Sequence, residues 1–160
     1  MKKHWPARQF RVLLVEDSQG DVRLIREALK ETSIPVELTV AHDGIEATDY
    51  LRQPGASGGP DLILLDLNLP RKNGREVLAE IKGSPTLRHI PVLVMTSSKA
   101  PDDIRGASSL NANCYITKPI NLLDYINVVH AIEDFWFITA TLPENFRPPY
   151  FPPARRQLAG

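Results

Sequence analysis

Three short apolar runs, each ended abruptly by polar residues, constrain the fold of this chain more than any other feature. The runs cover residues 12–15, 62–65 and 92–95, and apolar and polar residues do not alternate within them. Short apolar runs without alternation are typical of strands that are covered on both faces, as in parallel sheets. Two weaker strands are expected at residues 36–40 and 113–116.

Helical patterns separate these strands along the chain. Ser18, directly before the first pattern, is the expected N-cap of the first helix. The alternation of strands with helices predicts an α/β fold, a doubly wound five-stranded parallel sheet with helices on both of its faces. Five helices are expected, at residues 19–31, 44–51, 74–82, 101–110 and 121–137.

Composition and charge exclude several kinds of partner and site. The 160 residues fit a single domain, and a hydrophobic fraction of 42% is enough for an ordinary core. Nineteen basic and nineteen acidic side chains cancel, so that no overall field favours nucleic acid or an anionic membrane. The single cysteine, Cys114, excludes a disulfide within the chain and a cysteine-cluster zinc site.

The C-terminal end differs in composition from the rest of the chain. Five prolines fall within residues 143–153, among aromatic side chains, and such a sequence favours extended shapes over a helix. We therefore expect an N-terminal extension at residues 1–9, a globular domain at residues 10–138 and an arm rich in proline and aromatic residues at 139–160. We also expect a cytoplasmic protein, with neither a signal peptide nor a membrane span, and no DNA-binding output domain.

Three carboxylates stand at the ends of two of the apolar runs. Glu16 and Asp17 follow the first run, and Asp66 follows the second. In an open parallel sheet the ligand site lies beyond the carboxyl ends of the strands, and the three acids converge there if these two strands are neighbours. Closely packed carboxylates repel one another unless a cation is present. An open site of oxygen ligands suits Mg²⁺, which is the expected cofactor.

These positions carry a resemblance to a known family. Over residues 10–137 the chain resembles the receiver domains of two-component response regulators, the CheY-like fold, which implies the strand order 2-1-3-4-5 and a receiver domain at 10–138. Segments 60–82 and 135–143 are similar, within that family, to the stand-alone response regulators paired with bacterial phytochromes. The matching residues are Glu16-Asp17, Asp66, Thr96, Tyr115 and Lys118-Pro119, with turns at Asp43-Gly44 and Asn73-Gly74.

The resemblance implies a role for each residue of the site. Asp66 would accept a phosphoryl group from a histidine kinase, which the second resemblance implies is a bacterial phytochrome. Asp17, Asp66 and the backbone carbonyl of Asn68 would hold Mg²⁺, for which Mn²⁺ could substitute, and Glu16 would act through water molecules. Lys118 would bring a fixed cation to a phosphoryl oxygen. The protein would signal through protein–protein contacts in a phosphorelay, as a phosphoacceptor and not as an enzyme.

A switch is implied next to this site. The Thr96 hydroxyl would move toward the phosphoryl group, and Tyr115 would turn inward into the space that the hydroxyl leaves. The Lys118–Pro119 bond is expected to be cis, which would aim the ammonium at the site.

Two other classes of protein stay open. A Mg²⁺-dependent phosphatase with an aspartate nucleophile also uses acids at strand ends, but it needs a second acid two residues after the nucleophile, where this chain has Asn68. A binding module that uses the same fold without phosphorylation typically lacks one of the acids, the threonine or the lysine, and here all are present. Incubation with a small phosphodonor and Mg²⁺ separates the classes. Stable labelling indicates a receiver, turnover indicates a phosphatase, and neither indicates a binding module.

The last expected helix carries more apolar residues than one packed face needs. Its apolar arc spans about 200°, whereas a helix packed on one face of a sheet needs a stripe of little more than about 100°. We expect the excess, together with the arm, to form a homodimer around the helices at 101–110 and 121–137. The expected interface residues are Ile126, Val129, Trp136, Phe146 and Tyr150.

Overall fold

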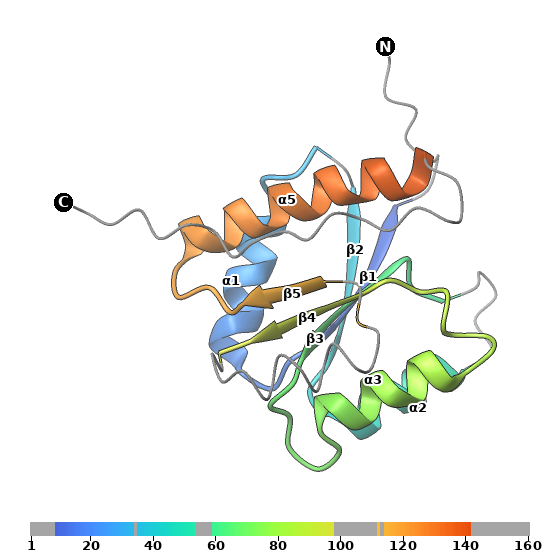
Figure 1. The fold of residues 1–160 in the computed structure, drawn as a ribbon. Coiled ribbons are helices and arrows are strands. Elements are labelled where there is room, and N and C mark those ends of the chain that lie inside the picture. The colour runs from blue at the N-terminus through green and yellow to red at the C-terminus, as the bar shows by residue number, and fades with distance from the viewer. Residues whose placement is uncertain (1–8, 34, 54–58, 98–111, 113, 142–160) are drawn as a thin grey trace.

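A computed structural model describes residues 9–33, 35–53, 59–97, 112 and 114–141, with side chains as far as residue 134. Five parallel strands form one sheet in the order β2-β1-β3-β4-β5 (Figure 1), which confirms the expected doubly wound sheet. The strands are β1 (Phe10–Val15), β2 (Val36–Ala41), β3 (Leu62–Asp66), β4 (Val92–Thr96) and β5 (Cys114–Thr117).

Helices cover both faces of this sheet. α1 and α5 lie on one face, and α2 and α3 lie on the other (Figure 1). The helix expected at residues 101–110 lies outside the described residues, and so does the arm from residue 142 onward. Within the described ranges, no helix is both long enough and apolar enough to cross a membrane. The helices are α1 (Gln19–Leu29), α2 (Gly44–Arg52), α3 (Gly74–Gly83) and α5 (Leu122–Thr141), the last of which continues beyond its predicted end.

Two cores, one on each face, hold the helices to the sheet. Successive residues of a strand point to opposite faces, so Val12 and Leu14 pack with α1 and α5, whereas Leu13 and Val15 pack with α2 and α3. All four side chains are at most 2% exposed. Because both faces of the sheet are buried, its strands have no polar side to show, which explains the uninterrupted apolar runs in the sequence.

α1, α2 and α3 each begin at a capping side chain. Ser18, Asp43 and Asn73 each accept a hydrogen bond from a backbone N–H in the first turn of their helix. Asn73 and Glu76 bond reciprocally, side chain to backbone, in a capping box. These caps hold the loops that follow β1, β2 and β3, at the edge of the sheet where the candidate site lies.

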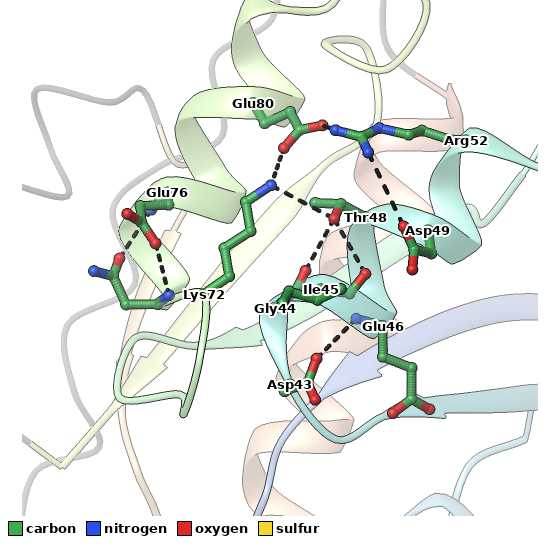
Figure 2. A network of polar contacts seen from close by, with 11 residues as sticks. Asp43, Gly44, Ile45, Glu46, Thr48, Asp49, Arg52, Lys72, Glu76 and Glu80 are labelled. Carbon is green, nitrogen blue, oxygen red and sulfur yellow. Dashed lines mark hydrogen bonds and ion pairs between the residues drawn. The ribbon is translucent and has the colours of Figure 1, made fainter.

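A polar network joins α2 to α3 and to the loop before α3 (Figure 2). Glu80 of α3 pairs with both Lys72 and Arg52. The Lys72 ammonium also lies 3.5 Å from the Thr48 hydroxyl. At Gly44, the first residue of α2, an added Cβ would lie 2.0 Å from the Lys72 carbonyl oxygen, so the loop passes directly over this glycine.

One residue of the expected dimer interface lies in the interior of the chain itself. Val129 is 3% exposed and packs in the same core as Tyr125, one turn before it on α5. That face of α5 is needed to cover α1 and the sheet, so Val129 is not available to a partner and its assignment to the interface is corrected. Ile126 is partly buried against the same core. Outside the described side chains lie the other expected interface residues, Trp136, Phe146 and Tyr150.

Candidate functional site

The carboxyl ends of β1 and β3 bring three carboxylates together. Val15 pairs with Leu65 in the parallel register, so the residues that follow them, Glu16 and Asp66, lie beside each other. One carboxylate oxygen from each of Glu16, Asp17 and Asp66 can be chosen so that all lie within 4.8 Å of one another. Glu16 and Asp66 are 0% and 3% exposed, whereas Asp17 is exposed. The structure therefore brings the acids together as the strand ends predicted.

Both oxygens of the Asp66 carboxylate accept hydrogen bonds. The backbone N–H of Asn68 donates to Oδ1 at 2.9 Å, and the Lys118 ammonium donates to Oδ2 at 3.1 Å. The side chain is 4% exposed. The two bonds, one from its own loop and one from the end of β5, fix the orientation of this carboxylate.

Glu16 is fully buried, and opposing effects set its protonation. Burial raises the pKa of Glu16, the hydrogen bond from Lys118 lowers it, the Asp66 charge raises it, and the net result is a pKa of about 7. The backbone N–H of Ser18 donates to Glu16 Oε1 at 3.0 Å. Burial therefore favours the neutral form of Glu16, and the hydrogen bond from Lys118 favours the ionised form.

Lys118 reaches the acids from directly beyond β5. Its backbone N–H donates to the Thr96 carbonyl at 2.8 Å, which extends the pairing of β4 with β5 past the end of the strand. Its ammonium nitrogen lies 2.9 Å from Glu16 Oε2, 2.9 Å from Asp21 Oδ2 and 3.1 Å from Asp66 Oδ2. Burial lowers the pKa of Lys118, but the hydrogen bonds to these carboxylates outweigh it, so that the pKa lies above its ordinary value. Lys118 is thus a permanent cation inside the site.

The Lys118–Pro119 bond is not cis, contrary to the expectation. No cis peptide bond occurs among the residues that the structure describes. The continued pairing with β4 already carries the Lys118 side chain to within 3.1 Å of Asp66. The lysine therefore reaches the acids with an ordinary trans bond.

Asp21 and Tyr125 also belong to this cluster, and neither residue was predicted from the sequence. The Tyr125 hydroxyl donates to Asp21 Oδ1 at 3.0 Å, between residues 104 positions apart in the sequence. Burial alone would raise the pKa of Asp21, but hydrogen bonds from Lys118 and Tyr125 bring it below its ordinary value. Burial raises the pKa of Tyr125, and its bond to Asp21 raises it further. An acid in the first turn of the helix after β1 was the only available signal, and no local pattern marks Tyr125.

Thr96 and Tyr115, the residues of the implied switch, lie on neighbouring strands. Thr96 ends β4 and is 4% exposed. The residue before it, Met95, pairs with Asp66, so Thr96 lies next to the end of the strand that carries Asp66. Tyr115 pairs with Val94 and is partly buried against the core beneath α2 and α3. The structure thus places both residues on the two strands between the acids and the far edge of the sheet.

A pocket of about 480 Å³ opens beside the acids. Asp17 and Asn68 contribute to its wall, and the Asn68 backbone also holds Asp66. A ligand in this pocket therefore lies against Asp17 and the loop between β3 and α3. The residues that line the pocket are Asp17, Leu67, Asn68, Leu69, Pro70, Asn73 and Arg75.

The acids suit a divalent cation. They supply only oxygen ligands, and one of them, Asp17, is exposed to solvent. Oxygen ligands with room for water are what Mg²⁺ and Mn²⁺ prefer. Asn68, whose backbone carbonyl is an expected ligand, lies in the loop directly after Asp66.

A parallel sheet of this order, with acids after β1 and β3 and a lysine after β5, defines a signalling domain of the receiver class. Residues 12–130 match the response regulator receiver domain, and the chain belongs to this family.

The relatives include a phytochrome response regulator. The chain is 52% identical over 135 residues to response regulator Rcp1 of Synechocystis sp.. The aligned region covers 82% of this chain and 92% of Rcp1. The phosphorylated cyanobacterial phytochrome response regulator RcpA has a TM-score of 0.77 at 52% identity, over 85% of this chain and 99% of that one. The Mn²⁺-bound form of Rcp1 has a TM-score of 0.73 at 50% identity, over 84% and 99% of the two chains.

Proposed function

We propose that this response regulator accepts a phosphoryl group on Asp66 from a histidine kinase and signals through protein contacts. The observation that carries the proposal is the pair of hydrogen bonds that orient the Asp66 carboxylate. The Asn68 backbone N–H donates one and the Lys118 ammonium donates the other, and Glu16 and Asp17 lie beside Asp66. Such an arrangement presents a carboxylate in a fixed direction next to a permanent cation. Phosphoryl transfer requires mostly this kind of positioning and charge neutralisation.

The transfer itself is a simple displacement. A carboxylate oxygen of Asp66 forms a bond to phosphorus while the bond from phosphorus to the kinase imidazole breaks, and the imidazole nitrogen keeps the bonding electrons. The product is an acyl phosphate on Asp66. Lys118 lies 3.1 Å from Asp66 Oδ2 and can neutralise negative charge on the incoming phosphoryl oxygens.

A divalent cation is part of the proposal, because three carboxylates converge next to the acceptor. Asp17, Asp66 and the backbone carbonyl of Asn68 would hold Mg²⁺, with Glu16 acting through water. When bound, the ion would offset the charge that the phosphoryl group and the acids share. The Mn²⁺-bound form of the relative Rcp1 supports this assignment by analogy.

The proposed kinase is a bacterial phytochrome. This partner is supported by analogy with the cyanobacterial phytochrome response regulator RcpA, to which the chain is 52% identical over 85% of its length. The proposed output runs through Thr96 and Tyr115, as the resemblance implies. The loop after β3 does not support the alternative of a phosphatase. Such an enzyme needs an acid two positions after the nucleophile, and this chain has the amide Asn68 there.

Transfer from a labelled kinase tests the proposal. Asp66→Asn keeps the volume of the side chain and removes the nucleophile, so labelling should vanish while the thermal midpoint stays near that of the wild type. Asp49→Asn, at an exposed carboxylate of α2, is the matched control and should label like the wild type. Labelling of the wild type should require Mg²⁺. Persistent labelling of Asp66→Asn, or free phosphate released from many substrates without a labelled protein, would refute the proposal.

We further propose a homodimer built on α5 and the arm. Leu123, in the first turn of α5, is 66% exposed, and Ile120 just before the helix is 81% exposed, so apolar surface remains outside the core at this end. Ile126 and Trp136 stay in the proposed interface, whereas Val129 does not. Sedimentation of the unphosphorylated chain should show a dimer that Ile126→Glu or Trp136→Glu weakens. A monomer at micromolar concentration for the full chain would refute a constitutive dimer.

A further inference from the structure

Each of the three N–H donors of the Lys118 ammonium has a carboxylate partner, and only two of these three carboxylates belong to the acid cluster. A lysine ammonium has three N–H donors, and Lys118 lies within 3.1 Å of three carboxylates, from Glu16, Asp21 and Asp66. A phosphoryl oxygen that bonds to Lys118 must therefore take the place of one of them. Glu16 and Asp66 belong to the acid cluster that suits a divalent cation, and Asp21 does not.

Asp21 is in turn fixed by a residue of a different helix. One oxygen of its carboxylate faces Lys118 at 2.9 Å, and the other accepts the hydroxyl of Tyr125 at 3.0 Å. Tyr125 is 1% exposed and packs in the core between α1 and α5, so its hydroxyl has little freedom to move. The Asp21 carboxylate thus has one defined orientation, with an oxygen aimed at the lysine.

We propose that Asp21 and Tyr125 are positioning residues for phosphorylation: Asp21 anchors the Lys118 ammonium while the phosphoryl group is bound, and the Tyr125 hydroxyl orients Asp21. This inference rests on the proposed function. When Glu16 and Asp66 turn toward a cation and the phosphoryl group, Asp21 is the carboxylate that still holds the lysine to the protein. Neither residue touches the phosphoryl group, because each acts through Lys118.

A purely structural role is the competing explanation, since the same bond also links α1 to α5. The two explanations differ in what they change. A structural link alters the thermal midpoint and leaves ligand binding alone. A positioning role weakens the binding of a phosphoryl group, which needs Lys118, much more than the binding of Mg²⁺, which needs the acids.

Binding of beryllofluoride, a phosphoryl analogue, to the full-length protein separates these explanations. Calorimetry in saturating Mg²⁺ should show about tenfold weaker binding for Asp21→Asn and about threefold weaker binding for Tyr125→Phe, which removes only the hydroxyl. Mg²⁺ affinity measured without beryllofluoride should change less than about twofold in Tyr125→Phe. Tyr50→Phe, at a partly buried tyrosine of α2 packed against the opposite core, is the matched control and should bind like the wild type.

The double variant Asp21→Asn/Tyr125→Phe gives the decisive comparison. If Tyr125 acts through Asp21, adding Tyr125→Phe to Asp21→Asn should weaken beryllofluoride binding no further. Wild-type affinity for beryllofluoride in both single variants, with or without a lower thermal midpoint, would overturn the inference and leave the proposed function intact. Failure of the wild-type protein to bind beryllofluoride or to label would instead refute the proposed function itself.

Discussion

Gly74 lies directly against the backbone of Asp66: a Cβ added to Gly74 would lie 2.3 Å from the Asp66 carbonyl oxygen and 2.5 Å from the Cα of Leu67. The first residue of α3 therefore touches the last residue of β3 across the loop between them. The Gly74 N–H also donates to the Leu67 carbonyl at 3.1 Å, which closes this loop. The position of the proposed acceptor thus depends on a residue without a side chain, eight positions further along the chain.

Gly74→Ala should disturb both the fold and the acceptor. The methyl group meets backbone atoms, which cannot rotate away, so the loop between β3 and α3 must shift, with a loss of about 1–3 kcal/mol in the free energy of unfolding. Because the shift displaces the Asp66 backbone, the rate of labelling should also fall. Urea unfolding and a labelling time course measure the two effects.

The control for this prediction is Gly83→Ala in the same helix. Nothing lies within 4 Å of a Cβ added at Gly83, so this change should leave stability and labelling near those of the wild type. Equal stability and equal labelling of Gly74→Ala and Gly83→Ala would show that the close contact between Gly74 and Asp66 does not determine the position of the acceptor.

Lys118→Met should separate metal binding from phosphorylation. The change removes the cation that lies within 3.1 Å of Glu16, Asp21 and Asp66 and keeps most of the apolar stem. With this repulsion gone, Mg²⁺ at pH 8 should bind about tenfold more tightly, an order of magnitude set by the interaction of charges a few ångströms apart. Labelling should fall steeply, since no cation meets the phosphoryl oxygens. Lys30→Met, at an exposed lysine of α1, should change neither quantity. Weaker Mg²⁺ binding in Lys118→Met at this pH would contradict the prediction.

The sequence predicted the features that follow from local patterns. The apolar runs gave the strands because both faces of the sheet are covered, and polar residues at strand ends gave the acid cluster because parallel strands end at one edge. The cap of α1 followed in the same way from Ser18, and the start of α2 followed from Asp43-Gly44.

Features that depend on distant pairing could not be predicted. The bond between Asp21 and Tyr125 spans 104 positions and depends on how α5 packs against α1, which no local pattern encodes. Val129 was assigned to the dimer interface for the same reason. The sequence gives the width of the apolar surface of a helix. Which part of that surface packs against the core depends on the tertiary structure.

Glu80→Gln should reduce stability at neutral pH but not in acid. The hydrogen bond from Lys72 is the main cause that lowers the pKa of Glu80 below its ordinary value of 4.5, burial opposes it, and Arg52 lowers it further (Figure 2). Because the pKa is depressed in the folded state, the ionised carboxylate stabilises the fold above pH 4.5, and this contribution is lost as the pH falls through the folded-state value. At pH 7 the variant should lose about 0.5–1 kcal/mol in the free energy of unfolding, a modest value because the group is partly exposed.

Denaturant unfolding at a series of pH values checks the Glu80 prediction. The curves of the wild type and Glu80→Gln should converge as the pH is lowered into the acid range. Glu27→Gln, which breaks an exposed pair with Lys30 in α1, is the control and should change stability less at pH 7. A constant difference between wild type and Glu80→Gln at every pH would show that the network acts through something other than the charge of Glu80.

Thr96→Ala should leave phosphorylation in place and remove its effect on Tyr115. The backbone carbonyl of Thr96, which accepts the Lys118 N–H at 2.8 Å, is unchanged in alanine, so the lysine should stay at the acids and Asp66 should still label. The hydroxyl that is proposed to follow the phosphoryl group is gone, and with it the reason for Tyr115 to turn inward. The ring resonances of Tyr115, recorded with and without beryllofluoride, should therefore shift in the wild type and stay nearly fixed in the variant. Thr117→Ala, at the exposed strand partner of Thr96, keeps a hydroxyl at position 96 and should shift like the wild type. An equal shift in Thr96→Ala and the wild type would mean that the signal leaves Asp66 by a route that does not include Thr96.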